Sequence, residues 1–343
     1  MRVSVTGATG LIGLRLVRAL RARGDQVIVL SRDPERAMRS LQDRTARSAG
    51  AGTGSATSSG NVTTGSSSGV AAGNLQAVAW DPSAEPAPAA GLAGSDAIVH
   101  LAGEPIAQRW SSSAKQAIRA SRVEGTRNLV AGISALAADE RPRTLISSSA
   151  VGYYGPHGDE PIDEEAPPGP GFLAQTCVAW EAEADAAAAT GATGEVGLGL
   201  RVVKVRTGVL LDPDGGALEK MLPPFKLGVG GPVAGGKQYV SWIVPEDLVG
   251  IMLAALEDER WSGAVNATAP QPVRNSELSK ALGRALHRPA LLPVPGLALK
   301  AMYGEMSEVV TTGARALPAK ALMNGYEFRY EQLDSALQAV LNP

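Results

Sequence analysis

The sequence predicts an α/β protein: a doubly wound parallel sheet, with a smaller, mainly helical lobe on the substrate side at the C-terminal end. Three observations lead to this prediction. A β-branched apolar run at the start ends in a glycine-rich turn, and strand and helix patterns then alternate. The alternation stops where glycine and proline become frequent. Strands that alternate with helices are what a parallel sheet covered by helices requires.

The glycine turn lies within residues 3–13, which read VSVTGATGLIG. Gly7 permits the tight turn from strand to helix, Gly10 lets a diphosphate approach the backbone, and Gly13 lets the helix pack closely on the strand. The helix start also offers unpaired N–H groups and a partial positive charge to an anion. The segment therefore predicts a dinucleotide-binding unit of the Rossmann type.

Further strands are predicted by short apolar runs, many of them β-branched, at residues 26–30, 75–80, 97–101, 143–149 and 200–207. Helical patterns begin after the glycine turn and recur between the strands, at residues 14–23, 113–120, 124–137 and 172–189. This order of strands and helices extends the first unit into a sheet with parallel strands.

Residues 48–74 interrupt the pattern and consist almost wholly of Gly, Ser, Thr and Ala. Few of these side chains can pack in a core, so the segment cannot offset the entropy cost of ordering it. We expect a flexible surface insertion here rather than a lid over a functional site. A second loop, rich in Ala and Pro, is predicted at residues 82–94.

The pattern changes after Val209. Glycines and prolines cluster at residues 223–236, and residues 274–343 are mostly helical with breaks at prolines. We therefore predict two domains. Residues 1–212 would form the NADP-binding domain, and residues 213–343 would form the substrate-side and C-terminal helical lobe.

The bulk composition excludes several classes of protein. A net charge of −2 and a pI near 6.0 provide no basic surface for nucleic acid. The single cysteine excludes an internal disulfide, and no Cys/His cluster has the spacing of metal ligands. No apolar run is long enough for a bilayer, and the first strand leaves no room for a signal peptide. We expect a cytoplasmic protein with a small-molecule substrate, no metal, and no nucleic-acid or membrane partner; the sequence does not indicate its oligomeric state.

The end of the second strand predicts NADP rather than NAD. An acidic residue there would bind the ribose hydroxyls of NAD and repel a 2′-phosphate. The chain instead has the neutral Ser31 and Arg32, whose guanidinium can form a charge-assisted bond with a phosphate. Asp33 and Pro34 are predicted to be the N-cap and first residue of the next helix. The alternative is that Arg32 is an ordinary exposed arginine.

Short motifs follow one another along the chain: GATGLIG at 7–13, LAGEPI at 101–106, RW at 109–110, SRV at 121–123, SAVGYYG at 149–155, WE at 180–181, RTGV at 206–209, LPPFKLG at 222–228, SWI at 241–243, LP at 317–318 and GYEFRY at 325–330. Together they resemble the extended short-chain dehydrogenase/reductases. The resemblance is to an atypical branch, the NAD-dependent epimerase/dehydratase-like proteins, which end in a C-terminal domain of unknown function. It covers nearly the whole chain apart from the insertion.

The resemblance implies roles for residues at the turn and at the end of the second strand. Thr9, Leu11 and Ile12 would approach the diphosphate of the cofactor, beside the three glycines. Ser31 and Arg32 would hold the phosphate on the adenosine ribose. The turn and the end of the second strand would together bind the diphosphate and the adenosine ribose phosphate of NADP.

The resemblance also implies cofactor contacts after the strand at residues 97–101. Leu101, Ala102 and Gly103 would line the path of the cofactor, as expected for ligands beyond the carboxyl ends of parallel strands. Arg122 and Arg206 would contact a phosphate or the substrate. The alternative is that both arginines form salt bridges on a helix surface or at a sheet edge.

Two departures from the family pattern affect the substrate side. After SWI the pattern continues with a histidine and an aspartate, but this chain has Val244 and Glu246, followed by Asp247. Near the C-terminus, Ala314 stands in place of a glutamine. Substrate contacts of the family therefore do not transfer at these positions.

The usual catalytic pair of short-chain reductases is absent. That pair is a tyrosine whose pKa is lowered by a lysine four residues later, on the same face of a helix. None of the six tyrosines has a lysine at this spacing. On the helix with Trp180 and Glu181, Leu173 and Cys177 occupy the two places.

Ser149, at the end of the strand at residues 143–149, is the candidate catalytic residue. The superfamily keeps a serine here that forms a hydrogen bond with the reacting carbonyl. The equal alternative is that the Ser149 hydroxyl only forms a structural hydrogen bond at the end of the strand.

Other side chains are weaker candidates. Tyr154 is another candidate acid, but its Gly-Tyr-Tyr-Gly turn favours a structural role, and Glu104 and Lys115 could reach the cleft. Two other reactive side chains are predicted to be buried core residues: His100 and Cys177.

Two functions follow from these observations. One is an NADP-dependent oxidoreductase, or epimerase-like enzyme, for a small carbonyl, hydroxyl or nucleotide-sugar-like substrate, in which a hydroxyl such as that of Ser149 polarises the substrate. The other is a non-catalytic NADP-binding sensor or partner-binding protein. The missing tyrosine–lysine pair favours the second function.

Overall fold

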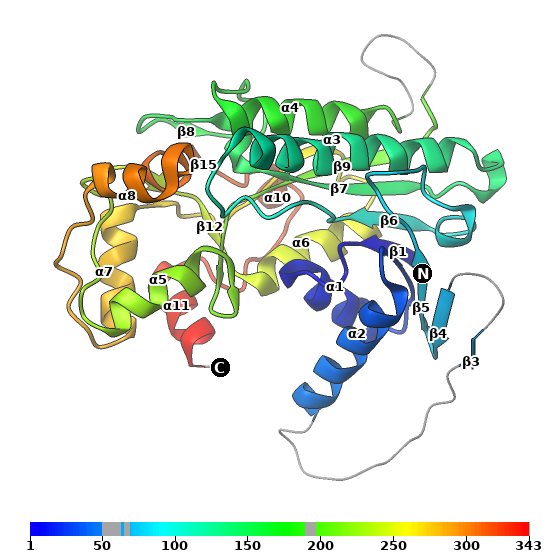
Figure 1. Cartoon of the computed structure of the whole chain (residues 1–343), viewed down its shortest axis with the longest axis horizontal. Helices are drawn as coiled ribbons and strands as arrows, with labels where there is room; N and C mark the ends of the chain where they lie inside the picture. Colours follow the sequence, from blue (N-terminus) through cyan, green and yellow to red (C-terminus); the bar gives the residue numbers. More distant parts are fainter. Residues whose placement is uncertain (50–62, 65–68, 189–196, 343) are drawn as a thin grey trace. The chain divides into compact units, whose positions relative to one another are not determined.

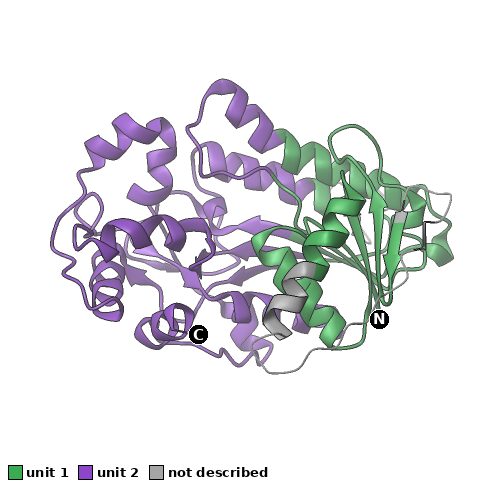
Figure 2. Cartoon of the chain, turned by 60° about the horizontal axis from the view of Figure 1, so that its bottom comes forward, with its two compact units in different colours: residues 1–103, 120–147, 183–202 green, residues 104–119, 148–182, 203–343 purple. Residues whose placement is uncertain are grey.

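The computed structural model of the chain describes residues 1–49, 63–64, 69–188 and 197–342 (Figure 1). The chain forms two compact units built from interleaved segments (Figure 2). The first unit comprises residues 1–103, 120–147 and 183–202, and the second comprises residues 104–119, 148–182 and 203–343. The predicted division between residues 212 and 213 stays a prediction.

The first unit contains a mostly parallel sheet in the order β7-β6-β1-β2-β5-β4-β3. From β1 the chain proceeds outward through β2 and β5, then returns to the other side of β1 for β6 and β7. This reversal makes the sheet doubly wound and confirms the predicted fold class. Its parallel strands are β1 (Arg2–Thr6), β2 (Gln26–Ser31), β5 (Leu75–Ala79), β6 (Ala97–His100) and β7 (Thr144–Ala150), whose last three residues belong to the second unit.

Helices cover both faces of this sheet, with α1 (Leu11–Ala22) and α2 (Pro34–Ala49) on one face and α3 (Ser112–Ser134) on the other (Figure 1). Apolar residues at helical spacing, such as Leu16 and Leu20 in α1, are buried against the sheet. The two helices predicted at residues 113–120 and 124–137 are one helix, because nothing between them breaks the backbone pattern. Two short 3₁₀ turns flank this helix in the sequence: η1 (Ala89–Gly91) precedes β6 and α3, and η2 (Ala138–Glu140) follows α3.

Part of the insertion at residues 48–74 forms strands. β3 (Thr63–Thr64) pairs antiparallel with β4 (Gly69–Ala72), and β4 pairs antiparallel with β5. The prediction of a loop was therefore wrong at these residues, because pairing with an edge strand orders a backbone whose side chains cannot form a core. Residues 50–62 and 65–68, for which flexibility was also predicted, lie outside the described residues.

The second unit contains a parallel pair of strands and three short two-stranded sheets. β9 (Arg201–Thr207) pairs with β13 (Gly263–Ala267), and the short sheets are β10 (Val209–Asp212) with β12 (Trp242–Ile243), β11 (Tyr239–Val240) with β14 (Val273–Arg274), and β8 (Pro161–Ile162) with β15 (Arg315–Ala316). Its helical segments are η3 (Val151–Tyr154), α4 (Phe172–Asp185), α5 (Gly216–Lys226), α6 (Pro245–Glu257), α7 (Asn275–Ala285), α8 (Gly296–Tyr303), η4 (Gly304–Ser307), α9 (Glu308–Thr311), α10 (Ala319–Met323) and α11 (Leu333–Leu341). The C-terminal region is mainly helical, as predicted.

Asp247, in the first turn of α6, fixes the C-terminal segment of the second unit. Its buried carboxylate accepts hydrogen bonds from the Tyr326 hydroxyl at 3.2 Å and from the backbone N–H groups of Arg329 at 2.8 Å and Tyr330 at 3.2 Å. A side chain at Gly250 would overlap the Tyr326 hydroxyl, so glycine is required there. Asp247 therefore has a structural role.

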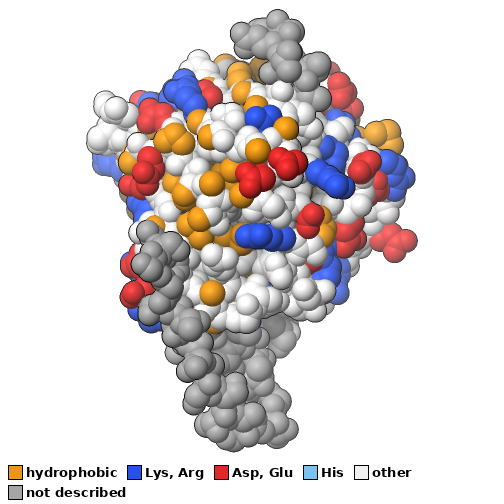
Figure 3. Space-filling view, turned by 90° about the vertical axis from the view of Figure 1, so that its right-hand side faces the viewer, with side chains coloured by type: hydrophobic (Ala, Val, Ile, Leu, Met, Phe, Trp, Pro, Cys, Tyr) orange, Lys and Arg blue, Asp and Glu red, His pale blue; other side chains and the backbone are white. Residues whose placement is uncertain are grey.

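Charged side chains of both signs are interspersed on the face of the molecule in Figure 3. In the described part of the chain, none of the helices combines the length and apolar character needed to cross a membrane.

His100 and Cys177 are buried, as predicted, with 0% and 5% of their surface exposed. In the first unit, the two ring nitrogens of His100 lie 2.8 Å from the Thr6 hydroxyl and 3.1 Å from the Thr126 hydroxyl. Both hydroxyls can donate or accept, so a neutral ring is fully hydrogen-bonded. Burial lowers the pKa of His100 from 6.5 to about 4.

We expect this histidine to make the protein less stable in acid. In the unfolded chain His100 takes up a proton near pH 6.5, whereas in the folded chain it stays neutral down to about pH 4. The unfolded state therefore binds more protons in this window, and the free energy of unfolding should fall by about 3 kcal/mol as the pH drops through it. Urea unfolding at a series of pH values measures the effect.

The matched comparison is His100→Gln, which should flatten the pH dependence between pH 6.5 and 4. His287→Asn, at an exposed position, is the control and should keep the wild-type slope. An equal slope in the wild type and His100→Gln would contradict the prediction.

Candidate functional site

The glycine turn joins β1 to α1 in the first unit and has the close contacts that the sequence predicts. Gly7 has a φ of +67°, and a Cβ there would lie 2.7 Å from the carbonyl carbon of Leu101. A Cβ at Gly13 would overlap the carbonyl oxygen of Gly7. Neither position tolerates a side chain. The steric roles predicted for Gly7 and Gly13 are confirmed.

The N-terminus of α1 is open to an anion. Gly10 is its N-cap residue, and no side chain caps the helix among the described residues. Thr9 and Gly10 are exposed, and Leu11 and Ile12 are half-buried. The first N–H groups of a helix have no partner within the helix, so this end can donate hydrogen bonds to a diphosphate.

Ser31 and Arg32 lie at the end of β2, as predicted. The Ser31 hydroxyl donates to the carbonyl oxygen of Asp33 at 3.2 Å, and Asp33 caps α2 by accepting from the N–H of Arg36 at 2.9 Å. Arg32 is exposed. Hydrogen bonds from Ser83 and, to a smaller extent, the charge of Arg32 lower the pKa of Asp81. Arg32 is therefore a surface cation that a phosphate can reach.

The residues after β6 converge on the same turn. The N–H groups of Leu101 and Ala102 donate to the Thr6 hydroxyl at 3.1 and 3.2 Å. The guanidinium of Arg122 lies against Gly103, where an added Cβ would be 3.3 Å from its Cζ. The structure thus brings together the turn and the residues after β6 within the first unit.

The second unit contains a buried ion pair between Arg206 of β9 and Glu181 of α4. Arg206 Nε and Nη2 donate to the two carboxylate oxygens at 2.9 and 2.8 Å, and both side chains are almost wholly buried. Although burial acts to lower the pKa of Arg206, the hydrogen bonds and charge of Glu181 raise it overall. Arg206 forms a salt bridge, as one of the two alternatives predicted, but the pair is buried instead of lying on a helix surface or at a sheet edge.

Ser149 is part of this network. Its hydroxyl donates to Glu181 Oε1 at 2.6 Å, and only 4% of its surface is exposed. A hydroxyl has one hydrogen to donate. Ser149 can therefore accept a hydrogen bond from another group without change, but can donate to a carbonyl only after it leaves Glu181.

Tyr154 is also bound into the network and does not suit proton transfer. Its hydroxyl donates to Asn266 Oδ1 at 2.7 Å and accepts from Arg206 Nη1 at 3.0 Å. Burial raises its pKa to about 12, with the charge of Arg206 opposing. Tyr153 lies beside it, with its ring centre 3.5 Å from Arg206 Cζ. Tyr154 therefore keeps its proton and has a structural role.

Glu164 extends the network to the C-terminal segment. Its buried carboxylate accepts from the backbone N–H groups of Asn266 at 2.9 Å and Lys320 at 3.2 Å, and burial raises its pKa. Lys115, the remaining basic candidate, pairs with Glu305. Glu104 is exposed.

The role of Glu181 was not predicted from the sequence, although its spacing on the helix is a signal of burial. Cys177, Trp180, Glu181 and Ala184 follow the 3- and 4-residue spacing of one helix face, and all four are buried. A carboxylate on an apolar face needs a buried partner. The spacing indicates the burial, but it does not identify Arg206 as the partner.

Two family models match the chain. The model of the NAD dependent epimerase/dehydratase family covers residues 3–267, and the model of a domain of unknown function, DUF1731, covers residues 294–340. The chain is 38% identical to the epimerase family protein SDR39U1 homolog, chloroplastic, of Arabidopsis thaliana, over 99% of this chain and 87% of the plant protein. It is 34% identical to the epimerase family protein YfhF of Bacillus subtilis, over 99% and 98% of the two chains.

The fold is also similar to a solved structure, the crystal structure of human epimerase family protein SDR39U1 (isoform 2) with NADPH. The two structures match with a TM-score of 0.77 and 30% sequence identity over 100% of both chains.

We expect Arg206→Met to lower the free energy of unfolding by about 3–5 kcal/mol, because it leaves the Glu181 carboxylate buried without its counter-charge. The double variant Arg206→Met/Glu181→Gln should recover roughly 1–3 kcal/mol of this loss, since no charge is then buried. Urea unfolding measures both values.

The control is Arg284→Met, in an ion pair with Asp334 whose side chains are 61% and 59% exposed. It should change the stability by less than about 1 kcal/mol. Equal effects of Arg206→Met and Arg284→Met would show that the buried pair is not the stronger constraint.

Proposed function

The chain belongs to the NAD dependent epimerase/dehydratase family, and we propose that it binds NADP and catalyses an oxidoreductase reaction. The proposed substrate is a small carbonyl or hydroxyl compound, or one related to a nucleotide sugar. The observation that carries the proposal is the open glycine turn of the first unit with an exposed arginine at the end of β2. The partner and compartment predicted from the sequence, a small molecule in the cytoplasm, are part of this proposal.

The proposed cofactor residues divide by the part of NADP they would hold. The N–H groups at the start of α1, with Thr9, Leu11 and Ile12, would bind the diphosphate. Ser31 and Arg32 would bind the 2′-phosphate, since a guanidinium forms strong charge-assisted bonds with phosphate. The human relative in complex with NADPH supports the choice of NADP over NAD.

Leu101, Ala102 and Gly103 would line the cofactor beyond the end of β6, and Arg122 would supply a further positive charge there. When bound, the nicotinamide would supply or accept the hydride. The chain itself would have to bind the substrate and manage the proton.

Ser149 is the proposed group for the substrate oxygen. Its bond to Glu181 leaves its oxygen free to accept from a substrate hydroxyl, so its resting geometry suits alcohol oxidation better than carbonyl reduction. Glu181 and Arg206 would hold the serine in place.

A second candidate function is a non-catalytic NADP-binding protein, either a sensor or a partner-binding module. The observation that favours it is the state of Ser149, whose hydroxyl is buried and already donates to Glu181. The absence of the tyrosine–lysine pair from the sequence has the same implication.

We expect Arg32→Ala to weaken NADPH binding about 10-fold and to leave NADH binding nearly unchanged, because only NADPH has the 2′-phosphate. Fluorescence titration of each nucleotide measures this. Arg36→Ala, at an exposed position in α2, is the matched control and should alter neither affinity. Tighter binding of NADH than NADPH by the wild type would argue against NADP.

We expect Ser149→Ala to lower the turnover of a carbonyl and alcohol panel about 100-fold, with NADPH affinity unchanged. Absorbance of NADPH measures the turnover. Ser279→Ala is the control, since Ser279 is a buried serine of the same unit whose hydroxyl has no hydrogen-bond partner among the described residues. Tight NADPH binding with no turnover of any compound would favour the non-catalytic function, and a nucleotide-dependent partner in a pull-down would support it.

A further inference from the structure

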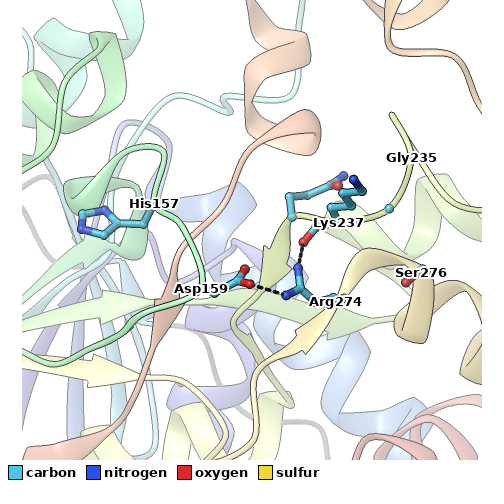
Figure 4. Close-up of a pocket in the computed structure, with 8 residues that line it drawn as sticks. His157, Asp159, Gly235, Lys237, Arg274 and Ser276 are labelled. Atoms are coloured by element: carbon cyan, nitrogen blue, oxygen red, sulfur yellow. Dashed lines mark hydrogen bonds and ion pairs between the residues drawn. The ribbon is translucent and has the colours of Figure 1, made fainter.

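We propose that a cavity beside Arg274 in the second unit is a binding site for a phosphate group. The cavity has a volume of about 580 Å³ and is lined by His157, Asp159, the loop at residues 235–238, Arg274 and Ser276. In Figure 4, dashed lines join the Arg274 guanidinium to the Asp159 carboxylate and to the carbonyl oxygen of Lys237, and the His157 ring lies apart from them. All of these residues belong to the second unit, whereas the residues proposed for the NADP phosphates belong to the first, so the two proposals can fail separately.

Arg274 is held in place before any ligand binds. Its Nη1 donates to the carbonyl oxygen of Lys237, and its Nη2 donates to Asp159 Oδ2 at 2.7 Å. The guanidinium also lies over the ring of Tyr239, with Cζ 4.8 Å from the ring centre. A guanidinium that is already oriented loses little conformational entropy when it binds an anion.

The loop before Arg274 adds a second cation. Ala234, Gly235 and Gly236 all have positive φ, at 48°, 83° and 68°. A Cβ at Gly236 would be 2.8 Å from the Cβ of Ser276, so the loop lies close against the start of α7 and needs glycine there. Lys237 follows directly, and its ammonium has no hydrogen bond or ion pair with any residue that the structure describes. Its charge is available to a ligand.

Asp159 is the only acidic side chain that lines the cavity in the described chain, and its side chain is 73% exposed. An exposed ion pair contributes little to stability because water and salt screen it. A phosphate that contacts both Lys237 and Arg274 gains two cations, whereas Asp159 pairs with only one. We therefore expect phosphate to displace the Asp159 carboxylate from Arg274.

The arrangement suits phosphate better than a carboxylate. The two cations come from different segments, and the Ser276 hydroxyl is a possible third donor on the cavity wall. A phosphate has several terminal oxygens that point in different directions, whereas the two oxygens of a carboxylate lie in one plane.

The test is calorimetric titration of the full chain with inorganic phosphate and, separately, with glucose 1-phosphate, with and without saturating NADPH. Arg274→Gln should weaken phosphate binding about 10-fold and Lys237→Ala about 5-fold. Asp159→Asn should strengthen it about 2- to 5-fold, because it removes the competing carboxylate. Binding of both probes would indicate a site for the phosphate group itself, and tighter binding of glucose 1-phosphate would indicate a phosphorylated metabolite.

Asp334→Asn is the matched control, since it also removes an exposed carboxylate from an arginine, here Arg284. It should leave phosphate affinity unchanged, and none of the four variants should alter NADPH affinity. The proposal is wrong if neither probe binds, if Asp159→Asn does not strengthen binding, or if Asp334→Asn strengthens it equally.

Discussion

The second unit depends on the buried ion pair between Arg206 and Glu181. Each charge costs free energy to remove from water, and the pair is stable only because further hydrogen bonds satisfy the remaining donors and acceptors. Ser149 donates to the carboxylate, and the Tyr154 hydroxyl and the carbonyl oxygen of Glu164 accept from the guanidinium. One ion pair thereby fixes α4, β9, the end of β7 and the 3₁₀ turn after it.

The same network determines which side chains are available for chemistry. The Tyr154 hydroxyl donates to Asn266 and has a raised pKa, so it does not suit proton transfer to a substrate at neutral pH. Arg206 is occupied on both edges of its guanidinium. The Ser149 hydroxyl, which donates to Glu181, keeps the capacity to accept a hydrogen bond. Of the two hydroxyl candidates, Ser149 and Tyr154, the network therefore leaves Ser149, and it limits what that hydroxyl can do at rest.

The parts of the fold that the sequence predicts are those with local causes. Gly7 turns the chain with a φ of +67°, a Cβ at Gly13 would overlap the carbonyl oxygen of Gly7 six residues earlier, and Asp33 caps a helix that starts one residue later. Strand β4 was missed because its order comes from pairing with β5 and not from its own side chains. The partner of Glu181 was missed for a similar reason, since Arg206 lies 25 residues along the chain. When two paired residues lie far apart in the sequence, the residues around each one can indicate that it is buried but cannot identify its partner.

The exposure of the acidic partner distinguishes a structural arginine, Arg206, from the proposed ligand-binding arginine, Arg274. Glu181 is buried, so a ligand that took its place on Arg206 would leave the Glu181 carboxylate charged and without water around it. Such a replacement costs too much free energy to occur. Asp159 is mostly exposed, and water can solvate its carboxylate once Arg274 turns to another anion. The two ion pairs have nearly the same length, 2.8 and 2.7 Å, although two guanidinium nitrogens bind Glu181 and one binds Asp159. Distance therefore does not identify a ligand-binding arginine, whereas the environment of its carboxylate partner does.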